Sequence, residues 1–399
     1  MTRPLTVLQL LPALESGGVE RSTLEIADAL VRAGHRALVM SAGGRLLPAL
    51  LDTGAEHVTL DIGRKSPMTL RHVRALRALC VREHVDIVHA RSRLPAWIGW
   101  LALRGWPADT RPSASKNQAP KPPTPKPHFV TTVHGLNSPS RYSAVMAKGE
   151  RVICVSDTVR GYVLQHYPAT DPAILRVIPR GIDPAAFPRA PLPDRAARAR
   201  VAATHPQLGG DGPLLLMPGR GTRLKGHADA LVLLAALRSD GIDARLWMPG
   251  ARDPTRADYI TELEMRASSL GIADIVAITA PTNAIAEAYA ASDLVLQLSR
   301  KPESFGRTVI EALSVGRPVL GWAHGGVGEL LDVLWPAGAA APFDAGALHT
   351  AARALLANRA PLPVTIAQAI LADYSLQAMQ DATLAVYAEF DPDDEQSRR

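Results

Sequence analysis

The sequence has 399 residues, more than one ordinary hydrophobic core organises, and its 47% hydrophobic and 21% charged residues are typical of a globular protein. The net charge of +6 and the isoelectric point of about 9.5 favour an anionic partner, namely nucleic acid, an anionic membrane face or a phosphorylated substrate. Nucleic acid is the weakest of the three, because aromatic residues are only 5% of the chain and neither zinc-finger spacing nor an RNP-type motif occurs.

Targeting signals and cysteine usage favour the cytoplasm. No apolar run is long enough to span a bilayer, and the first residues lack the small-residue cleavage site of a signal peptide. The two cysteines, Cys80 and Cys154, cannot form a disulfide framework, and each lies in an apolar run. We therefore predict a cytoplasmic protein. The net positive charge, together with Lys116, Lys121 and Lys126 in the predicted mobile segment, further predicts peripheral attachment to the anionic inner face of the cytoplasmic membrane.

In the first half of the chain, short apolar runs alternate with longer segments of helical periodicity. This alternation predicts βαβ units and a parallel sheet. The predicted strands are residues 6–10, 37–41, 87–89, 129–133 and 151–155, and the predicted helices are residues 18–33, 67–83, 94–104 and 156–166.

A second series of the same kind follows, with predicted strands at 213–217, 244–248, 275–278, 294–297 and 319–321. Six prolines between residues 179 and 212 indicate a linker between the two series. The fold class is therefore α/β with two Rossmann-like domains, 1–182 and 183–375. A last helix, 376–390, is expected to pack back on the first domain and to precede a flexible tail, 391–399. A segment rich in Pro, Lys and Ser, 109–127, is predicted to be mobile.

The strongest chemical signal is a pair of carboxylates, Glu303 and Glu311, separated by seven residues. A helix is predicted to begin near Ser304, with Glu311 about two turns inside it. Gly306 would let a ligand approach the first turn closely, where free backbone N–H groups form an anion site. This arrangement suits a ligand with a diphosphate in the middle and hydroxyl groups at both ends.

These residues resemble the signature of the retaining GT-B glycosyltransferases of family 4 (group 1), and the resemblance extends over nearly the whole chain. It implies two domains that face each other across a cleft. It also implies that Glu303 contacts the hydroxyls of the donor sugar and that Glu311 binds the ribose of the nucleotide. The amides that would face the phosphates belong to Ser304, Phe305, Gly306 and Arg307.

A glycine-rich loop follows the first strand of the second series. The spacing of Gly221 and Gly226 mimics half a P-loop, but His227 stands where the P-loop lysine would be needed. The loop resembles the family segment in which an arginine and a lysine, here Arg220 and Lys225, neutralise the donor diphosphate. We assign both to donor binding and catalysis, with Arg223 as an alternative for either and a plain basic turn as the competing interpretation.

Five further candidate residues lie in the loops that follow three strands of the first series. Gly17 and Gly18 open a helix, and the resemblance places them against the donor, although a plain tight turn explains them equally well. His134 follows a strand at the edge where α/β sites form, and the resemblance makes it a catalytic contact with the donor sugar. Arg91 and Arg93 resemble a stretch in members assigned to lipopolysaccharide core synthesis and are predicted to bind an anionic acceptor, unless they form an ion cluster at a helix start.

No metal site and no cofactor are expected, because the paired-Cys and H-E-x-x-H motifs are absent and D-x-D occurs only at 391–393. Arg220, Lys225 and a helix N-terminus are expected to supply the positive charge instead. The predicted function is retaining transfer of a hexosyl group from a UDP- or GDP-linked donor to a cell-envelope glycolipid or lipopolysaccharide. An epimerase of the same fold and a non-catalytic sugar-nucleotide binding protein are the alternatives.

Overall fold

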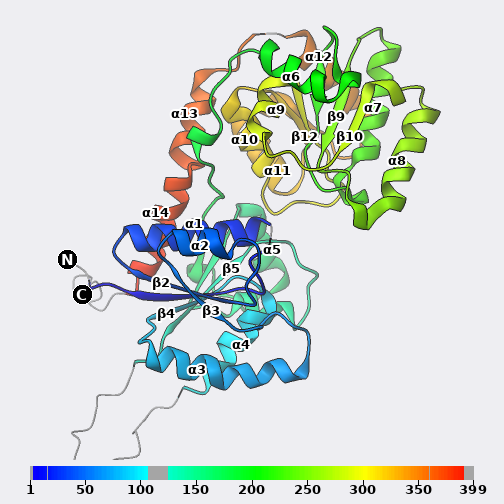
Figure 1. The fold of residues 1–399 in the computed structure, drawn as a ribbon. Coiled ribbons are helices and arrows are strands. Elements are labelled where there is room, and N and C mark those ends of the chain that lie inside the picture. Colours follow the sequence, from blue (N-terminus) through cyan, green and yellow to red (C-terminus); the bar gives the residue numbers. More distant parts are fainter. Residues whose placement is uncertain (1–2, 16, 107–124, 359, 391–399) are drawn as a thin grey trace, which may run out of the picture. The chain divides into compact units, whose positions relative to one another are not determined.

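The computed structural model describes residues 3–15, 17–106, 125–358 and 360–390. The chain divides into two compact units, one formed by residues 1–179 together with the chain from Met379 on, and the other by residues 180–378. Each unit contains one parallel sheet with helices on both faces, so the predicted pair of Rossmann-like α/β domains is confirmed (Figure 1). Two predicted segments, the irregular stretch up to residue 124 and the tail 391–399, lie outside the described residues.

The first unit is built on a seven-stranded sheet in the order β3-β2-β1-β4-β5-β6-β7. Its strands are β1 (Thr6–Leu10), β2 (Arg36–Ser41), β3 (Glu56–Thr59), β4 (Ile87–Ala90), β5 (His128–Val133), β6 (Arg151–Cys154) and β7 (Leu175–Val177). β3 and β7 were not predicted. The first is a half-exposed edge strand of sequence EHVT and the second has three residues, so neither produces a long apolar run.

Helices cover the two faces of this sheet according to the direction of each crossover. α1 (Gly18–Arg32) and α2 (Leu47–Asp52) cover one face, and α3 (His72–Arg82) and α4 (Arg93–Arg104) cover the other. α5 (Asp157–His166) connects β6 with β7. The two cysteines are buried and unpaired, and burial raises the pKa of each thiol to about 12, so both are inert core residues.

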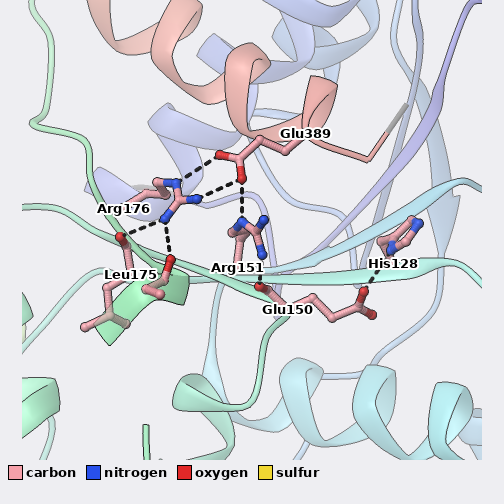
Figure 2. A network of polar contacts seen from close by, with 7 residues as sticks. His128, Glu150, Arg151, Leu175, Arg176 and Glu389 are labelled. Atoms are coloured by element: carbon pink, nitrogen blue, oxygen red, sulfur yellow. Dashed lines mark hydrogen bonds and ion pairs between the residues drawn. The ribbon is translucent and has the colours of Figure 1, made fainter. Parts of the chain in front are cut away.

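The C-terminal helix α14 (Leu376–Ala388) is anchored to the first unit by charged and polar contacts. Glu389 accepts hydrogen bonds from Arg151 at 2.5 Å and from Arg176 at 2.8 and 2.9 Å (Figure 2). The buried Tyr387 hydroxyl lies 2.6 Å from Nδ1 of His89. The last helix therefore belongs to the domain formed by the beginning of the chain.

The second unit is built on a six-stranded sheet in the order β10-β9-β8-β11-β12-β13. Its strands are β8 (Leu214–Leu216), β9 (Arg245–Pro249), β10 (Val276–Thr279), β11 (Leu294–Gln297), β12 (Val319–Trp322) and β13 (Ala339–Ala340). Its helices are α6 (Arg195–Thr204), α7 (His227–Ser239), α8 (Ala257–Ser269), α9 (Ile285–Ala291), α10 (Arg307–Val315), α11 (Gly325–Leu334), α12 (Ala345–Ala357) and α13 (Val364–Asp373). The central strands are fully buried and almost entirely apolar, as strands covered on both faces must be.

The segment predicted as a linker has more structure than its prolines indicated. It contains α6, whose N-terminus is capped by the Asp194 carboxylate, which accepts hydrogen bonds from the amides of Ala196 and Ala197. Within the described residues, no helix is long and apolar enough to cross a bilayer.

Candidate active site

The candidate active site of the second unit lies where the direction of its chain winding reverses. β8 is followed by β9 on one side and pairs with β11 on the other, so the strand order runs outward from β8 in both directions and the loops after β8 and β11 are neighbours at the carboxyl edge of the sheet. Crevices of this kind are where open α/β sheets bind ligands. Lys225 follows β8 and Glu303 follows β11, which places both predicted groups at this point.

The loop after β8 is held tightly by close backbone packing. Gly226 has a left-handed conformation with φ of +80°, and a Cβ atom there would lie 1.9 Å from the carbonyl oxygen of Leu298. The amide of Arg300 donates to the carbonyl of Leu224 at 2.7 Å, so the loops after β8 and β11 are joined directly. Arg300 also binds Asp229 of α7 through two hydrogen bonds of 2.6 and 2.8 Å. Lys225 is therefore presented from a fixed backbone.

The loop after β11 is supported by the glycines that open α11. The amide of Gly326 donates to the carbonyl of Glu303 at 2.7 Å. Gly325 has φ of +59°, and a Cβ atom there would come within 2.7 Å of the same carbonyl. A Cβ atom on Gly326 would lie 2.5 Å from Cα of Phe305. Glycine is thus required at both positions because the backbone at the start of α11 lies directly against the backbone of Glu303 and Phe305. This contact fixes the segment that carries Glu303.

The side chains of Lys225 and Glu303 meet at this edge of the sheet. Nζ of Lys225 donates to Oε1 of Glu303 at 2.6 Å, and the two side chains are 27% and 25% exposed. The hydroxyl of Ser299 donates to the same carboxylate oxygen. The imidazole of His324 lies 2.7 Å from the carbonyl of Ser299, which braces that turn. An ammonium has three N–H donors, so the pair can orient Lys225 while leaving donors for a phosphate.

The helix that carries the second carboxylate begins later than predicted. α10 starts at Arg307, not near Ser304, so Glu311 lies about one turn inside it and not two. The cause is Gly306, which N-caps the helix and ends the extended segment that Gly326 holds. Gly306 has no side chain to cap the helix, so no side-chain cap competes with an anion at this N-terminus. Phe305 is 6% exposed, so its side chain belongs to the core and is not available to a ligand.

Glu311 is held by a buried tyrosine. The hydroxyl of Tyr289, which is 1% exposed, donates to Oε2 of Glu311 at 2.8 Å. Burial and the neighbouring carboxylate raise the pKa of Tyr289 well above its ordinary value, so it remains a hydrogen-bond donor. Arg307 lies 3.9 Å from the other oxygen and also donates to the carbonyl of Gly181. Glu311 is 12% exposed and its position is set by these contacts.

The structure separates the two arginines considered for the diphosphate. Arg220 is exposed on the loop after β8. Arg223 instead binds Glu262 of α8, with Nε at 3.0 Å, and its guanidinium lies 5.1 Å from the centre of the Tyr259 ring. Arg223 is therefore committed to α8, and Arg220 remains the candidate partner of Lys225.

The remaining predicted residues belong to the first unit. Gly17 N-caps α1 with φ of +154°, and Gly18 is its first residue with space around it for a larger group. His134 follows β5 and is half-buried. Arg93 begins α4, with Nη1 3.4 Å from the hydroxyl of Ser143. The contacts predicted for these residues with donor or acceptor stay predictions.

Arg91 requires a correction. It is 2% exposed and donates to Gln9 of β1 at 2.6 Å and to Ser22 of α1. Burial lowers the pKa of the guanidinium to about 10. A side chain enclosed and bonded in this way does not reach an acceptor, so its predicted role at the rim is wrong. Its neighbour His89 is fully buried as well.

Three supporting residues were not found from the sequence: Ser299, Tyr289 and His324. Ser299 lies at the carboxyl end of β11, a position that could have drawn attention to it. Tyr289 has no local signal, because it lies in an alanine-rich helix 22 residues before Glu311. In the described part of the chain, no group of three His, Cys, Asp or Glu side chains is placed to hold a metal, and metal independence stays a prediction.

Comparison with known proteins decides the family. Residues 16–186 match the model of the Glycosyltransferase Family 4 domain, and residues 204–370 match that of the Glycosyl transferases group 1 domain. The chain is a GT-B protein built from these two glycosyltransferase domains. The candidate active site at β8, β11 and α10 lies in the group 1 domain.

Individual relatives agree with this assignment at the level of the fold. A glycosyltransferase from Rickettsia africae ESF-5 superposes with a TM-score of 0.83 at 27% identity, covering 97% of this chain and 98% of that one. Anabaena Alr3699/HepE in complex with UDP-glucose gives a TM-score of 0.76 at 18% identity, covering 96% and 100%. A D-inositol 3-phosphate glycosyltransferase of Geodermatophilus obscurus is 30% identical over 61% of this chain and 53% of its own. The chain thus spans about half the length of that curated relative.

Proposed function

We propose that this protein transfers a hexosyl group from a UDP- or GDP-linked sugar to a cell-envelope glycolipid or lipopolysaccharide, with retention of anomeric configuration. The observation that carries the proposal is the meeting of Lys225 and Glu303 at 2.6 Å, a few residues before the N-terminus of α10. A cation, a helix N-terminus and a carboxylate at one edge of the sheet suit a substrate with a diphosphate next to a polyol.

The proposed chemistry is stabilisation of a leaving group. Cleavage of the bond between the sugar and the diphosphate places negative charge on the departing phosphate oxygens. Lys225 and Arg220, with the amides of residues 304–307, would neutralise that charge without a metal ion. The acceptor hydroxyl would attack from the side on which the phosphate departs, which gives retention.

The two carboxylates would have different tasks in this mechanism. Glu303 would bind the sugar hydroxyls and orient Lys225 through the hydrogen bond that the structure contains. Glu311, braced by Tyr289, would bind the ribose hydroxyls of the nucleotide. Ribose contacts are similar before and during bond cleavage, whereas the Lys225 contact strengthens as charge develops.

The proposed acceptor class comes from the sequence resemblance, because the similarity to known proteins does not identify the acceptor of this protein. One of them is named for an inositol phosphate acceptor, so that class belongs in the test. Attachment to the anionic inner face of the cytoplasmic membrane would bring the protein to a lipid-borne acceptor.

The test is an assay of nucleotide release over a panel of UDP- and GDP-linked sugars. It is run with lipid-linked glycans, lipopolysaccharide fragments and inositol phosphate as acceptors, and NMR determines the anomeric configuration of the product. Donor-dependent release that an acceptor accelerates supports transfer. Conversion of the donor sugar without release would make the protein an epimerase, and binding without turnover would make it a silent binding protein. An inverted product would contradict retention alone.

A further inference from the structure

The positive charge of this protein is concentrated in one short part of the sequence. Residues 62–106 contain nine Lys or Arg but only two Asp or Glu. The rest of the chain contains 35 Lys or Arg and 36 Asp or Glu. The whole net charge of +6 therefore comes from this segment. An even distribution would need no explanation, but a local excess of this size points to an anionic partner.

The segment includes the central strand β4 and the buried Arg91, and its remaining elements form a layer on one face of the first sheet. This layer comprises the 3₁₀ turn η1 (Pro67–Arg71), α3 and α4, and we call it the α3–α4 layer. The two helices pack against each other (Figure 1), and Nε of Arg77 on α3 donates to the carbonyl of Ala102 on α4 at 2.9 Å. Neither helix contains an Asp or a Glu, while Arg71, Arg74 and Arg104 are exposed.

Two apolar side chains project from the start of this layer. Met68 is 63% exposed and Leu70 is 53% exposed, both on η1. Arg64 and Lys65 precede them and are exposed, and Arg71 follows directly. Exposed apolar groups surrounded by cations are unfavourable in water but suit the boundary between lipid headgroups and acyl chains.

Two tryptophans on α4 also place apolar surface next to cations. Trp97 and Trp100 contact each other edge to face with ring centres 5.4 Å apart. Arg104 and Lys148 lie 5.0 and 5.1 Å from the Trp100 ring centre. Both tryptophans are half-buried, so part of each side chain is exposed to solvent. Amphipathic tryptophans beside cations are typical of groups that lie at headgroup level.

We propose that the α3–α4 layer docks onto an anionic phospholipid surface, with its arginines against the headgroups and Met68 and Leu70 inserted between them. The inference extends the proposed function, because a membrane would present a lipid-borne acceptor, but its evidence is independent of the donor site. A purely electrostatic partner such as nucleic acid would use the arginines and have no use for the apolar pair. The exposed Met68 and Leu70 therefore favour lipid.

The experiment measures sedimentation of the full chain with vesicles of phosphatidylcholine alone and vesicles that also contain phosphatidylglycerol. The chain should bind only the anionic vesicles. Arg71→Gln/Arg74→Gln/Arg104→Gln should weaken this binding by about tenfold or more, because each basic residue near the surface contributes separately. Met68→Ser/Leu70→Ser should also weaken it, and the binding that remains should be more sensitive to salt.

A matched control comes from α8 of the second unit. Met265 is 63% exposed, as Met68 is, and Arg266 next to it is exposed, but the acidic side chains Glu262 and Glu264 flank them. Met265→Ser/Arg266→Gln should bind anionic vesicles as the unaltered chain does. Thermal unfolding of all variants shows whether the α3–α4 layer stays folded.

The proposal is overturned if neutral and anionic vesicles bind equally, or if the arginine variant binds as well as the control. It is also overturned if the apolar variant retains full binding while duplex DNA displaces the vesicles, since the site would then recognise polyanions in general. Donor hydrolysis should be unchanged in every variant. Vesicle binding without any donor turnover would refute the proposed function and leave the docking surface intact.

Discussion

Replacement of Lys225 by alanine tests the active site most directly. The substitution removes the ammonium that contacts Glu303 at 2.6 Å, together with the cation proposed to face the leaving diphosphate. The loop backbone should not change, because it is held by Gly226 and by the hydrogen bond from Arg300 to Leu224. The effect on folding and the effect on catalysis can therefore be separated.

The expected effect of this substitution on stability is much smaller than its expected effect on catalysis. Both side chains are about a quarter exposed, so loss of the ion pair should cost at most about 1 kcal/mol of unfolding free energy. In a unit of this size, that lowers the melting temperature by roughly 2–4 °C. Removal of a charge that faces a developing phosphate should lower kcat by about 10²–10³, which is roughly 3–4 kcal/mol of transition-state stabilisation.

The assay compares steady-state transfer and calorimetric binding of the free nucleotide diphosphate for Lys225→Ala with Arg223→Ala. Arg223 lies on the same loop, but Glu262 holds it on α8, so its loss should leave kcat near that of the unaltered protein. Near-normal turnover of Lys225→Ala would refute the proposed site. Equal loss of turnover in both variants would show that the loop as a whole, and not the ammonium at Glu303, is required.

Three further predictions follow from the geometry. Glu303→Gln should lower kcat with little change in nucleotide diphosphate affinity, whereas Glu311→Ala should chiefly raise the donor KM; identical kinetic changes in both would contradict the division of tasks. A chelator should leave the transfer rate nearly unchanged, and activity lost to chelation and restored by magnesium or manganese would show that a metal supplies the charge. Burial alone would raise the pKa of Glu389, but hydrogen bonds from Arg176 and Arg151 hold that pKa below its ordinary value. The anchor of α14 is therefore intact above about pH 4 and is lost as the pH falls through the lowered pKa. Hydrogen exchange should show α14 losing protection on acidification, with a smaller loss in Glu389→Gln; an equal pH dependence in both proteins would place the cause elsewhere.

The sequence alone determined the two-sheet architecture. Strands buried on both faces require near-continuous apolar runs, so β1, β4, β8 and β11 were predicted within one or two residues. β3 was not predicted, because an exposed edge strand does not need a continuous apolar run. The start of α10 was predicted three residues too early, because local spacing does not show that Gly326 binds the segment before the helix. Candidate residues of the donor site could be predicted because glycines and charged residues come directly after predicted strands, a pattern that is visible in the sequence.

Only the tertiary structure decided which of these residues act together. Lys225 and Glu303 are 78 positions apart, and they meet because β8 and β11 are neighbours in the sheet. The same kind of long-range pairing removed Arg91 from the predicted acceptor site, because Gln9 on β1 and Ser22 on α1 enclose it. A charged side chain after a strand has the same local signature whether it faces solvent or the interior. Its environment depends on elements that local sequence does not specify, so the function of such a residue is settled only when the sheet is assembled.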